Sequence, residues 1–239
     1  MGFAFGIEIK HGIQHLRRWL LLAICVLAQL VPHFAHSAAS EPSAVDVGIY
    51  LNNIPAVSLK EKKFQVDFNI WFRWKGDAIN PSETFKIFNG TIDVKDGLVT
   101  KTIGDTKYAS QRVQATIYRN FDVARFPLDD QTLKIQIEDS KSDGTAMAYV
   151  ADQANTNVSS KVTVPGWTVG KIDSYNSVTS YKTNYGDISL AKDAEARFPR
   201  YTFAIELKRA GYGYFLKYYS MLFLAAALTS IGFIIRSDL

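Results

Sequence analysis

The sequence predicts an all-β fold, an immunoglobulin-like β-sandwich, followed by one apolar helix near the C-terminus. Segments between residues 45 and 207 repeatedly alternate apolar and polar residues with a period of two. This alternation is typical of strands that bury one face in a core. Clusters of Gly, Asn and Asp separate the segments, and no amphipathic helix is evident among them. Many short strands at this spacing favour two packed sheets.

The first two predicted strands carry the clearest pattern. Residues 45–57 alternate and end at a turn that contains Pro55, and residues 64–74 alternate more strictly. One face of the second strand is entirely apolar and is expected to lie in the core. Its members are Phe64, Val66, Phe68, Ile70, Phe72 and Trp74.

The later strands are shorter and follow the same rule. In one of them Leu133, Ile135 and Ile137 share a face. The predicted strands are residues 111–118, 133–137, 162–169, 172–181 and 201–207. Turns are expected where small and polar residues cluster, namely at Asn89-Gly90, Lys95-Asp96-Gly97 and Asp143-Gly144.

Residues 1–39 have the pattern of a secretory signal peptide. Arg17 and Arg18 precede an apolar run at residues 19–31, and small residues follow up to Ala39. A run of about 13 residues is short for a hydrocarbon core of ~30 Å. We therefore expect cleavage near Ala38 or Ala39, with an uncleaved anchor as the alternative.

Residues 212–236 are predicted to form a transmembrane helix. From Tyr218 onward the chain has no charged residue for 18 positions, and tyrosines with Lys217 stand at its start. Arg236 at its end suits the cytoplasmic side. The expected organisation is a periplasmic or extracellular domain at residues 40–211, this helix in the inner membrane, and a cytoplasmic stub at residues 237–239. A buried core helix is the alternative.

Composition excludes several functional classes. The net charge is +4 without a dense basic patch, which gives no reason to expect nucleic acid as a partner. The single cysteine, Cys25, and all four histidines precede residue 40. A mature chain would thus lack cysteine and histidine chemistry, so we expect no metal, no cofactor and no enzymatic activity. A carboxylate-dependent glycosidase that uses Glu138, Asp139 and Asp143 is the alternative.

Residues 119–135 contain Phe126-Pro127-Leu128-Asp129 in a turn before a strand. This segment resembles the defining loop of the pentameric Cys-loop ligand-gated ion channels. Arg119 and Leu133 stand where the cysteines would be, as in the prokaryotic branch without the disulfide. Residues 70–77 resemble the second strand of that family, with one residue inserted, and residues 85–89 and 200–209 resemble its first binding loop and last strand.

The resemblance implies a homo-pentamer that binds a small ligand between neighbouring subunits, beneath a hairpin at about residues 181–198. The complementary side would carry residues of the second strand and its neighbour: Asn69, Trp71, Arg73 and Arg112. Ser140 stands where many animal receptors have a binding tryptophan. The hairpin would supply Tyr181, Tyr185, Phe198 and Tyr201, for which edge packing is the alternative role.

The resemblance also implies a group of coupling residues at the end of the sandwich near the helix. They are Phe126, Pro127, Asp129, Arg209, Lys60 and Glu61. We predict that Asp129 and Arg209 form a partly buried ion pair, and the alternative is an exposed surface pair.

Three functions follow as expectations. The first is a ligand-gated channel subunit, opened by a small molecule or by protons acting on carboxylates such as Asp46, Asp67, Asp122, Asp129 or Glu138. The sequence stops before the pore-lining helix of that family, and its apolar helix lacks the proline common there. The second is therefore a membrane-tethered periplasmic binding or sensor protein without a pore. The enzyme described above is the third.

Overall fold

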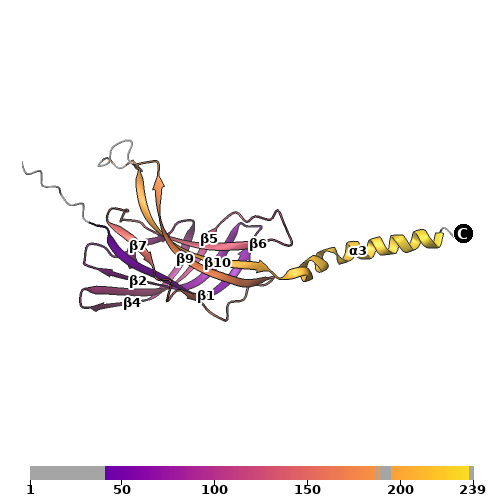
Figure 1. Ribbon diagram of the computed structural model, residues 1–239, viewed down its shortest axis with the longest axis horizontal. Coiled ribbons are helices and arrows are strands. Elements are labelled where there is room, and N and C mark those ends of the chain that lie inside the picture. Colours follow the sequence, from indigo (N-terminus) through magenta and orange to yellow (C-terminus); the bar gives the residue numbers. More distant parts are fainter. Residues whose placement is uncertain (1–40, 187, 189–194, 237–239) are drawn as a thin grey trace, which may run out of the picture. The chain divides into compact units, whose positions relative to one another are not determined.

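The computed structural model describes residues 41–186, 188 and 195–236 (Figure 1). The predicted signal peptide at residues 1–39 and the predicted stub at residues 237–239 lie outside the described residues. Most of the described chain is β-structure, arranged as two sheets in a sandwich.

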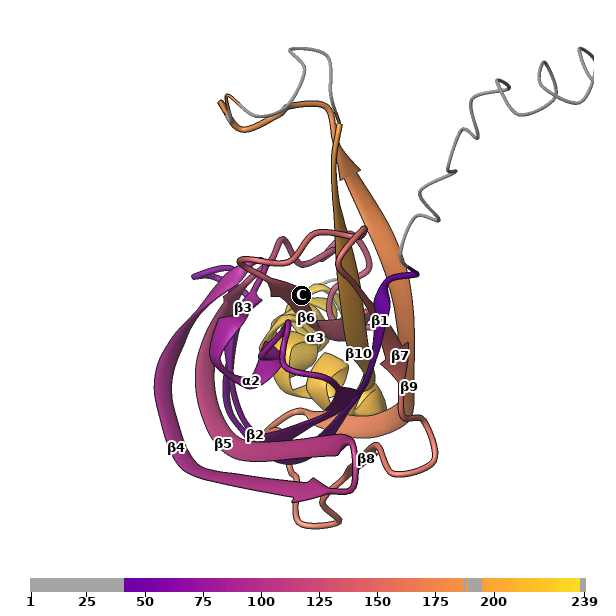
Figure 2. The same cartoon turned by 90° about the vertical axis from the view of Figure 1, so that its left-hand side faces the viewer.

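The first sheet has the strand order β4-β5-β2-β1-β7, with β8 paired to β1. β1 is antiparallel to β2 and parallel to both β7 and β8. Figure 2 shows β4, β5 and β2 curving together along one side of the sandwich. The strands of this first sheet are β1 (Ser43–Ser58), β2 (Lys63–Lys75), β4 (Gly90–Ile103), β5 (Thr106–Tyr118), β7 (Met147–Ala151) and β8 (Asn157–Val158).

The second sheet has the order β3-β6-β10-β9, and its pairs are antiparallel. β9 and β10 run together as a long hairpin that extends beyond the other strands (Figure 2). Its strands are β3 (Phe85–Ile87), β6 (Asp130–Asp139), β9 (Trp167–Tyr181) and β10 (Ala196–Arg209).

The core lies between the two sheets and confirms the period-two prediction. The apolar face of β2 is buried, with Phe68, Ile70 and Phe72 at 0% exposure. Leu133, Ile135 and Ile137 of β6 face it from the other sheet and are at most 1% exposed. At about 25 cal/mol per Å² of apolar surface removed from water, this continuous aromatic and aliphatic layer is the main favourable contribution to folding.

The structure corrects the predicted bounds of two strands. β1 is longer than residues 45–57, and the segments predicted at 162–169 and 172–181 form one strand, β9, that starts only at Trp167. β1 continues past Pro55, since its register with β2 shifts between Asn53 and Ala56 and the proline needs no ladder hydrogen bond there. Pro165-Gly166 forms a turn closed by the Trp167 amide and the Val164 carbonyl, 2.9 Å apart, so β9 begins at Trp167.

β4 was not predicted from the sequence. The turn predicted at Asn89-Gly90 is confirmed, because a turn at Phe88 and Asn89 leads into the strand at Gly90. The turn predicted at Lys95-Asp96-Gly97 is wrong, because these residues lie within β4, at a register shift between Asp96 and Val99. Gly97 has φ +64°, so it absorbs the irregularity without a steric penalty. β4 pairs only with β5 and is almost fully exposed, which removed the apolar alternation that would have revealed it.

Two helices are described. α2 (Pro81–Thr84) is a single turn before β3, and α3 (Gly211–Arg236) follows β10 after Ala210. Within residues 41–186, 188 and 195–236, no helix combines the length and the apolar character that a membrane crossing requires. The predicted transmembrane segment at residues 212–236 is therefore helical, but it is not shown as a membrane span.

Candidate ligand site and strand–helix junction

Four aromatic side chains gather where β9 and β10 enter the hairpin, and we call Phe88, Tyr181, Tyr185 and Phe198 the hairpin cluster. The Tyr181 ring lies 5.8 Å from Tyr185, 6.0 Å from Phe198 and 6.3 Å from Phe88 between centroids. Tyr185 and Phe198 meet edge to face at 6.3 Å. Three of the four aromatics that the resemblance assigned to the hairpin are thus brought together.

A buried carboxylate lies beneath the hairpin cluster. Glu138 of β6 is 1% exposed, and its Oε1 accepts hydrogen bonds from Arg200 Nε at 2.9 Å and Nη2 at 2.5 Å. The Tyr181 hydroxyl donates to the same oxygen at 2.9 Å. Burial, and then this hydrogen bond to an anion, raise the pKa of Tyr181 to about 12. The hydroxyl therefore stays protonated and fixed.

Cations of the chain itself occupy two ring faces of the hairpin cluster. The Arg200 guanidinium lies 3.9 Å from the Phe88 ring centroid, and the Lys86 ammonium lies 5.4 Å from that of Phe198. Lys86 is also 3.7 Å from Glu138. Two cations and one carboxylate leave the hairpin cluster with a positive balance, and an incoming cation would have to displace one of the two from its ring.

The predicted complementary residues lie on the exposed face of the other sheet. Trp71 of β2 donates from Nε1 to Asp152 Oδ2 at 3.1 Å, and Arg73 Nη2 donates to the same oxygen at 2.9 Å. The indole lies so close to Gly48 of β1 that a Cβ there would be 2.6 Å from Cε2. Only glycine allows this approach, and the tryptophan is thereby fixed in place.

A second ion pair stands beside this group. Asp67 of β2 accepts from Arg112 Nε at 2.9 Å and Nη2 at 2.5 Å, across the β2–β5 ladder. The Arg112 hydrogen bond, opposed by burial, holds the pKa of Asp67 below the ordinary carboxyl value. Asn69, which pairs with Arg112 in register, donates to Asn52 Oδ1 at 3.1 Å. These residues form an ordered polar surface.

Two predicted ligand residues do not join either group. Tyr201 is 0% exposed and lies in the core, with its hydroxyl 3.4 Å from Thr156 Oγ1, because its position in β10 is one step out of phase with Arg200. Ser140 donates from both its amide and its hydroxyl to the Thr84 carbonyl, at 3.0 and 2.7 Å. Its hydroxyl thus fastens a loop to α2.

The predicted ion pair between Asp129 and Arg209 is confirmed. Arg209 Nε and Nη2 donate to the two carboxylate oxygens of Asp129 at 2.7 and 3.1 Å, and the two side chains are only 8% and 3% exposed. The Arg209 guanidinium also lies 4.0 Å from the Trp167 ring centroid and 5.1 Å from that of Phe126. The alternative of an exposed surface pair is excluded by this burial.

Asp129 is held in its charged form. Burial raises its pKa, but hydrogen bonds from Arg209 and Gln131 outweigh burial and leave the pKa below the ordinary value. Gln131 Nε2 donates to Asp129 at 2.9 Å and to the Asp122 carbonyl at 2.5 Å. Arg209 is the last residue of β10, two residues before α3 begins, so this pair ties the loop at residues 119–129 to the strand–helix junction.

The other predicted coupling residues do not take part in the Asp129–Arg209 ion pair. Pro127 is buried and follows a cis peptide bond after Phe126. Glu61 forms an exposed ion pair with Lys63 at 2.9 Å, and Lys60 is exposed. The turn that carries them contacts the start of the loop, because the Arg119 amide donates to the Lys62 carbonyl at 2.8 Å.

The carboxylates of the glycosidase alternative are used within the fold. Asp139 Oδ1 accepts the amides of Lys141 and Ser142 at 2.8 and 2.6 Å, and Asp143 accepts those of Thr145 and Ala146. Glu138 is bonded to Arg200 as described above. Among residues 41–186, 188 and 195–236, no group of His, Cys, Asp and Glu side chains has the arrangement of a metal site.

Comparison of the chain with known protein families finds no family model that matches, and comparison with curated proteins finds no match either. The site therefore has to be interpreted from its own geometry.

Several residues of these groups were not predicted. Lys86 and Phe88 belong to the segment at residues 85–89 that resembles a binding loop, but neither was named as a site residue. Trp167 and Arg200 were not named either, because alternation within one strand cannot show which residues of different strands meet. Arg200 precedes the predicted strand at residues 201–207, and a charged residue beside core residues must face outward or pair with a carboxylate.

Proposed function

We propose that this chain is a subunit of the pentameric ligand-gated channel type, which binds a small ligand between neighbouring sandwich domains and passes the signal to helix α3. The observation that carries the proposal is the buried Asp129–Arg209 pair. It links the loop after β5 to the last residue of β10, two residues before α3, and its guanidinium contacts the rings of Trp167 and Phe126. Breaking one partner of a buried pair is costly, which suits a two-state element.

The distribution of the predicted ligand residues supports an interface site. The hairpin cluster belongs to the second sheet, whereas Trp71, Arg73 and Arg112 lie on the exposed face of the first sheet. One copy of the chain cannot bring these two surfaces into a single site. Contact between two copies can do so, and a heterologous contact that repeats around an axis closes into a ring.

The exposed surface of α3 supports contact with a bilayer or with neighbouring helices. Between Phe215 and residue 235 its apolar side chains are mostly exposed, for example Met221 at 76% and Phe233 at 75%. The hydroxyls of Thr229 and Ser230 donate hydrogen bonds to backbone carbonyls four residues earlier in the helix, at 2.9 and 2.8 Å. Such a surface needs an apolar cover. We place α3 at the inner membrane and the sandwich on the periplasmic side.

The test is disulfide cross-linking of the full chain in membranes, in a Cys25→Ser background that removes the only cysteine. Tyr185→Cys combined with Arg112→Cys places one thiol on each of the two proposed surfaces. We expect oxidation to give a ladder of covalent oligomers that ends at the pentamer. The matched control is Tyr185→Cys with Tyr175→Cys, which keeps both thiols on β9 and its hairpin and is expected to give no such ladder.

A chain that remains monomeric by native mass spectrometry, or a ladder equally strong in the control, would contradict the interface site. Current recording from membranes that contain the cross-linked ring then distinguishes a pore-forming subunit from a tethered binding protein.

A further inference from the structure

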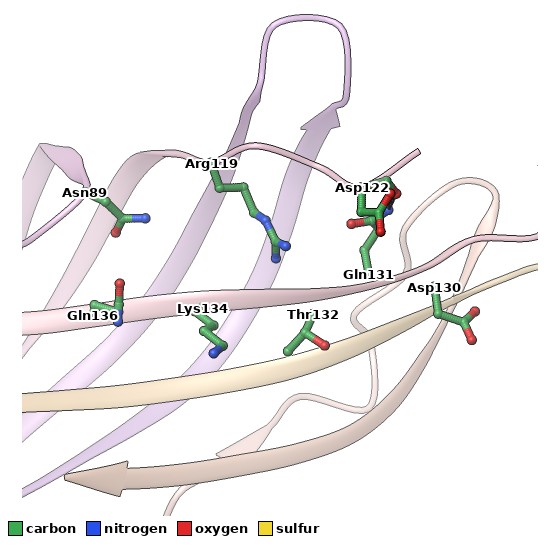
Figure 3. Close-up of a pocket in the computed structure, with 8 residues that line it drawn as sticks. All are labelled: Asn89, Arg119, Asp122, Asp130, Gln131, Thr132, Lys134 and Gln136. Atoms are coloured by element: carbon green, nitrogen blue, oxygen red, sulfur yellow. Dashed lines mark hydrogen bonds between the residues drawn. The ribbon is translucent and has the colours of Figure 1, made fainter. Parts of the chain in front are cut away.

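A polar cavity of about 580 Å³ lies next to the loop at residues 119–129 and is separate from the hairpin cluster (Figure 3). One wall is β6, through the outward side chains of Thr132, Lys134 and Gln136. The opposite wall is the start of the loop that crosses from β5 to β6, through Arg119 and Asp122. The cavity exists because β6 pairs with β3 only at residues 137–139, so the rest of that strand edge faces the loop and not another strand.

Two cationic side chains line the cavity, one from each wall. In Figure 3 Arg119 extends from the loop toward β6, and Lys134 projects from β6, with Asn89 and Gln136 at one end of the view and Asp122 and Asp130 at the other. In the part of the chain that the structure describes, neither cation has a carboxylate within ion-pair distance. Asp122 and Asp130 also line the cavity, but neither carboxylate forms an ion pair with Arg119 or Lys134.

Arg119 is held there at a cost. Its side chain is half-buried, and burial lowers the pKa of its guanidinium. Among the residues that the structure describes, its side chain contacts the Asn120 carbonyl at 3.4 Å and the Phe121 ring at 5.2 Å. Partly buried charges are normally paired. A planar guanidinium fork opposite an ammonium group matches an oxyanion, since the fork takes two oxygens and the ammonium adds a point charge.

Two further features limit the kind of anion. The carboxylates of Asp122 and Asp130 stand at one end, where they accept the amides of Ala124 and Arg209, and they would repel a second negative charge. At the other end, the Asn89 Nδ2 donates to the Tyr118 carbonyl at 2.9 Å, while its Oδ1 is buried and has no partner. The lining therefore favours a singly charged ligand over a polyanion.

We propose that this cavity binds a small organic monocarboxylate, with its oxygens between Arg119 and Lys134. The site is separate from the hairpin cluster, and the binding itself does not rest on the proposed channel function. Gln131 lines the cavity and also donates to Asp129 of the junction pair, so ligand binding could influence that pair. Such an influence on gating would rest on the proposed channel function.

The test uses the purified full chain and acetate as the probe, observed by saturation-transfer NMR and titrated at constant ionic strength. We expect millimolar binding that weakens at least about tenfold in Lys134→Gln, since a charge-assisted bond is lost. Lys134 is exposed, and its side chain makes no hydrogen bond or ion pair with the residues that the structure describes, so this substitution should leave the fold intact. Arg119→Gln should have the same effect. The matched control is Lys101→Gln, which removes an exposed lysine from β4 and should leave acetate binding unchanged.

Two comparison probes test the ligand class. Ethylammonium should not bind, and inorganic phosphate should bind more weakly than acetate. Equal acetate binding in the wild type and in Lys134→Gln would overturn the site, and phosphate binding tighter than acetate would overturn the choice of a monocarboxylate. An equal loss in Lys101→Gln would reduce the effect to general surface charge and would overturn the proposal as well.

Discussion

Removing both members of the Asp129–Arg209 pair should cost much less stability than the sum of the two single removals. The variants are Asp129→Ala, Arg209→Met and the double variant. Methionine keeps an apolar stem against Trp167, which the guanidinium contacts at 4.0 Å in the wild type. The comparison therefore isolates the charges more cleanly than alanine at both positions.

The magnitude follows from burial. With side chains 8% and 3% exposed, each single variant leaves a charge in a site that water hardly reaches, which costs about 3–5 kcal/mol. The double variant leaves no unpaired charge. We therefore expect a coupling energy of about 2–3 kcal/mol, at the upper end for residues in direct contact.

The assay is urea unfolding of the purified full chain in detergent, followed by tryptophan fluorescence and extrapolated linearly to zero urea. The control cycle uses Glu61→Ala and Lys63→Ala, an ion pair of similar distance whose side chains are 58% and 38% exposed. We expect no measurable coupling there, because exposed pairs are screened by solvent.

Additive free energies at Asp129 and Arg209, with coupling below about 0.5 kcal/mol, would refute the reasoning. The two side chains would then contact each other without stabilising the fold as a pair, and the pair could not serve as a switch element. A loss of coupling only in high salt would also count against burial, since buried pairs are weakly screened.

Three further predictions follow from the same contacts. The folded pKa of Asp129 is depressed, so its contribution to stability is present above the unfolded value of about 4 and is lost as the pH falls through the lowered folded pKa. The stability advantage of the wild type over Asp129→Asn should accordingly shrink on acidification, as measured by urea midpoints, and a constant difference would contradict this sign. Burial raises the pKa of Tyr181 to about 12, and it also raises the pKa of Tyr201 to about 12 and that of Tyr149 well above its ordinary value. Ultraviolet titration should therefore show several tyrosines that ionise late, and Tyr181→Phe should reduce their number by one. The stability that Tyr181 contributes is full below about pH 10 and is lost as the pH rises toward 12. Gly48→Ala should destabilise the chain by about 1–3 kcal/mol, because the new Cβ meets the indole of Trp71 at 2.6 Å, whereas Gly213→Ala, with nothing within 4 Å, should be neutral in the same thermal melts.

Local patterns in the sequence were sufficient for the core of this domain. The alternation in β2 identified every buried residue of its inner face, because side chains of a strand point to opposite sides with a fixed period of two. β4 escaped because it is an exposed edge strand, in which no face has to be apolar. The alternation also could not show that Pro55 lies within β1, since a register shift depends on the partner strand.

The candidate sites, too, were predictable from the sequence only in part. The sequence by itself determined which residues carry chemistry: the Phe126-Pro127-Leu128-Asp129 turn, the closing Arg209, and a described chain without histidine or cysteine. Only the tertiary structure decided which partners they meet. It brought the rings of Trp167 and Phe126 to 4.0 and 5.1 Å from the Arg209 guanidinium, paired Glu138 with Arg200, and buried Tyr201 in the core. Ion pairs and ring contacts join residues from different strands, and their distances and burial are set by sheet order and register, which no single segment encodes.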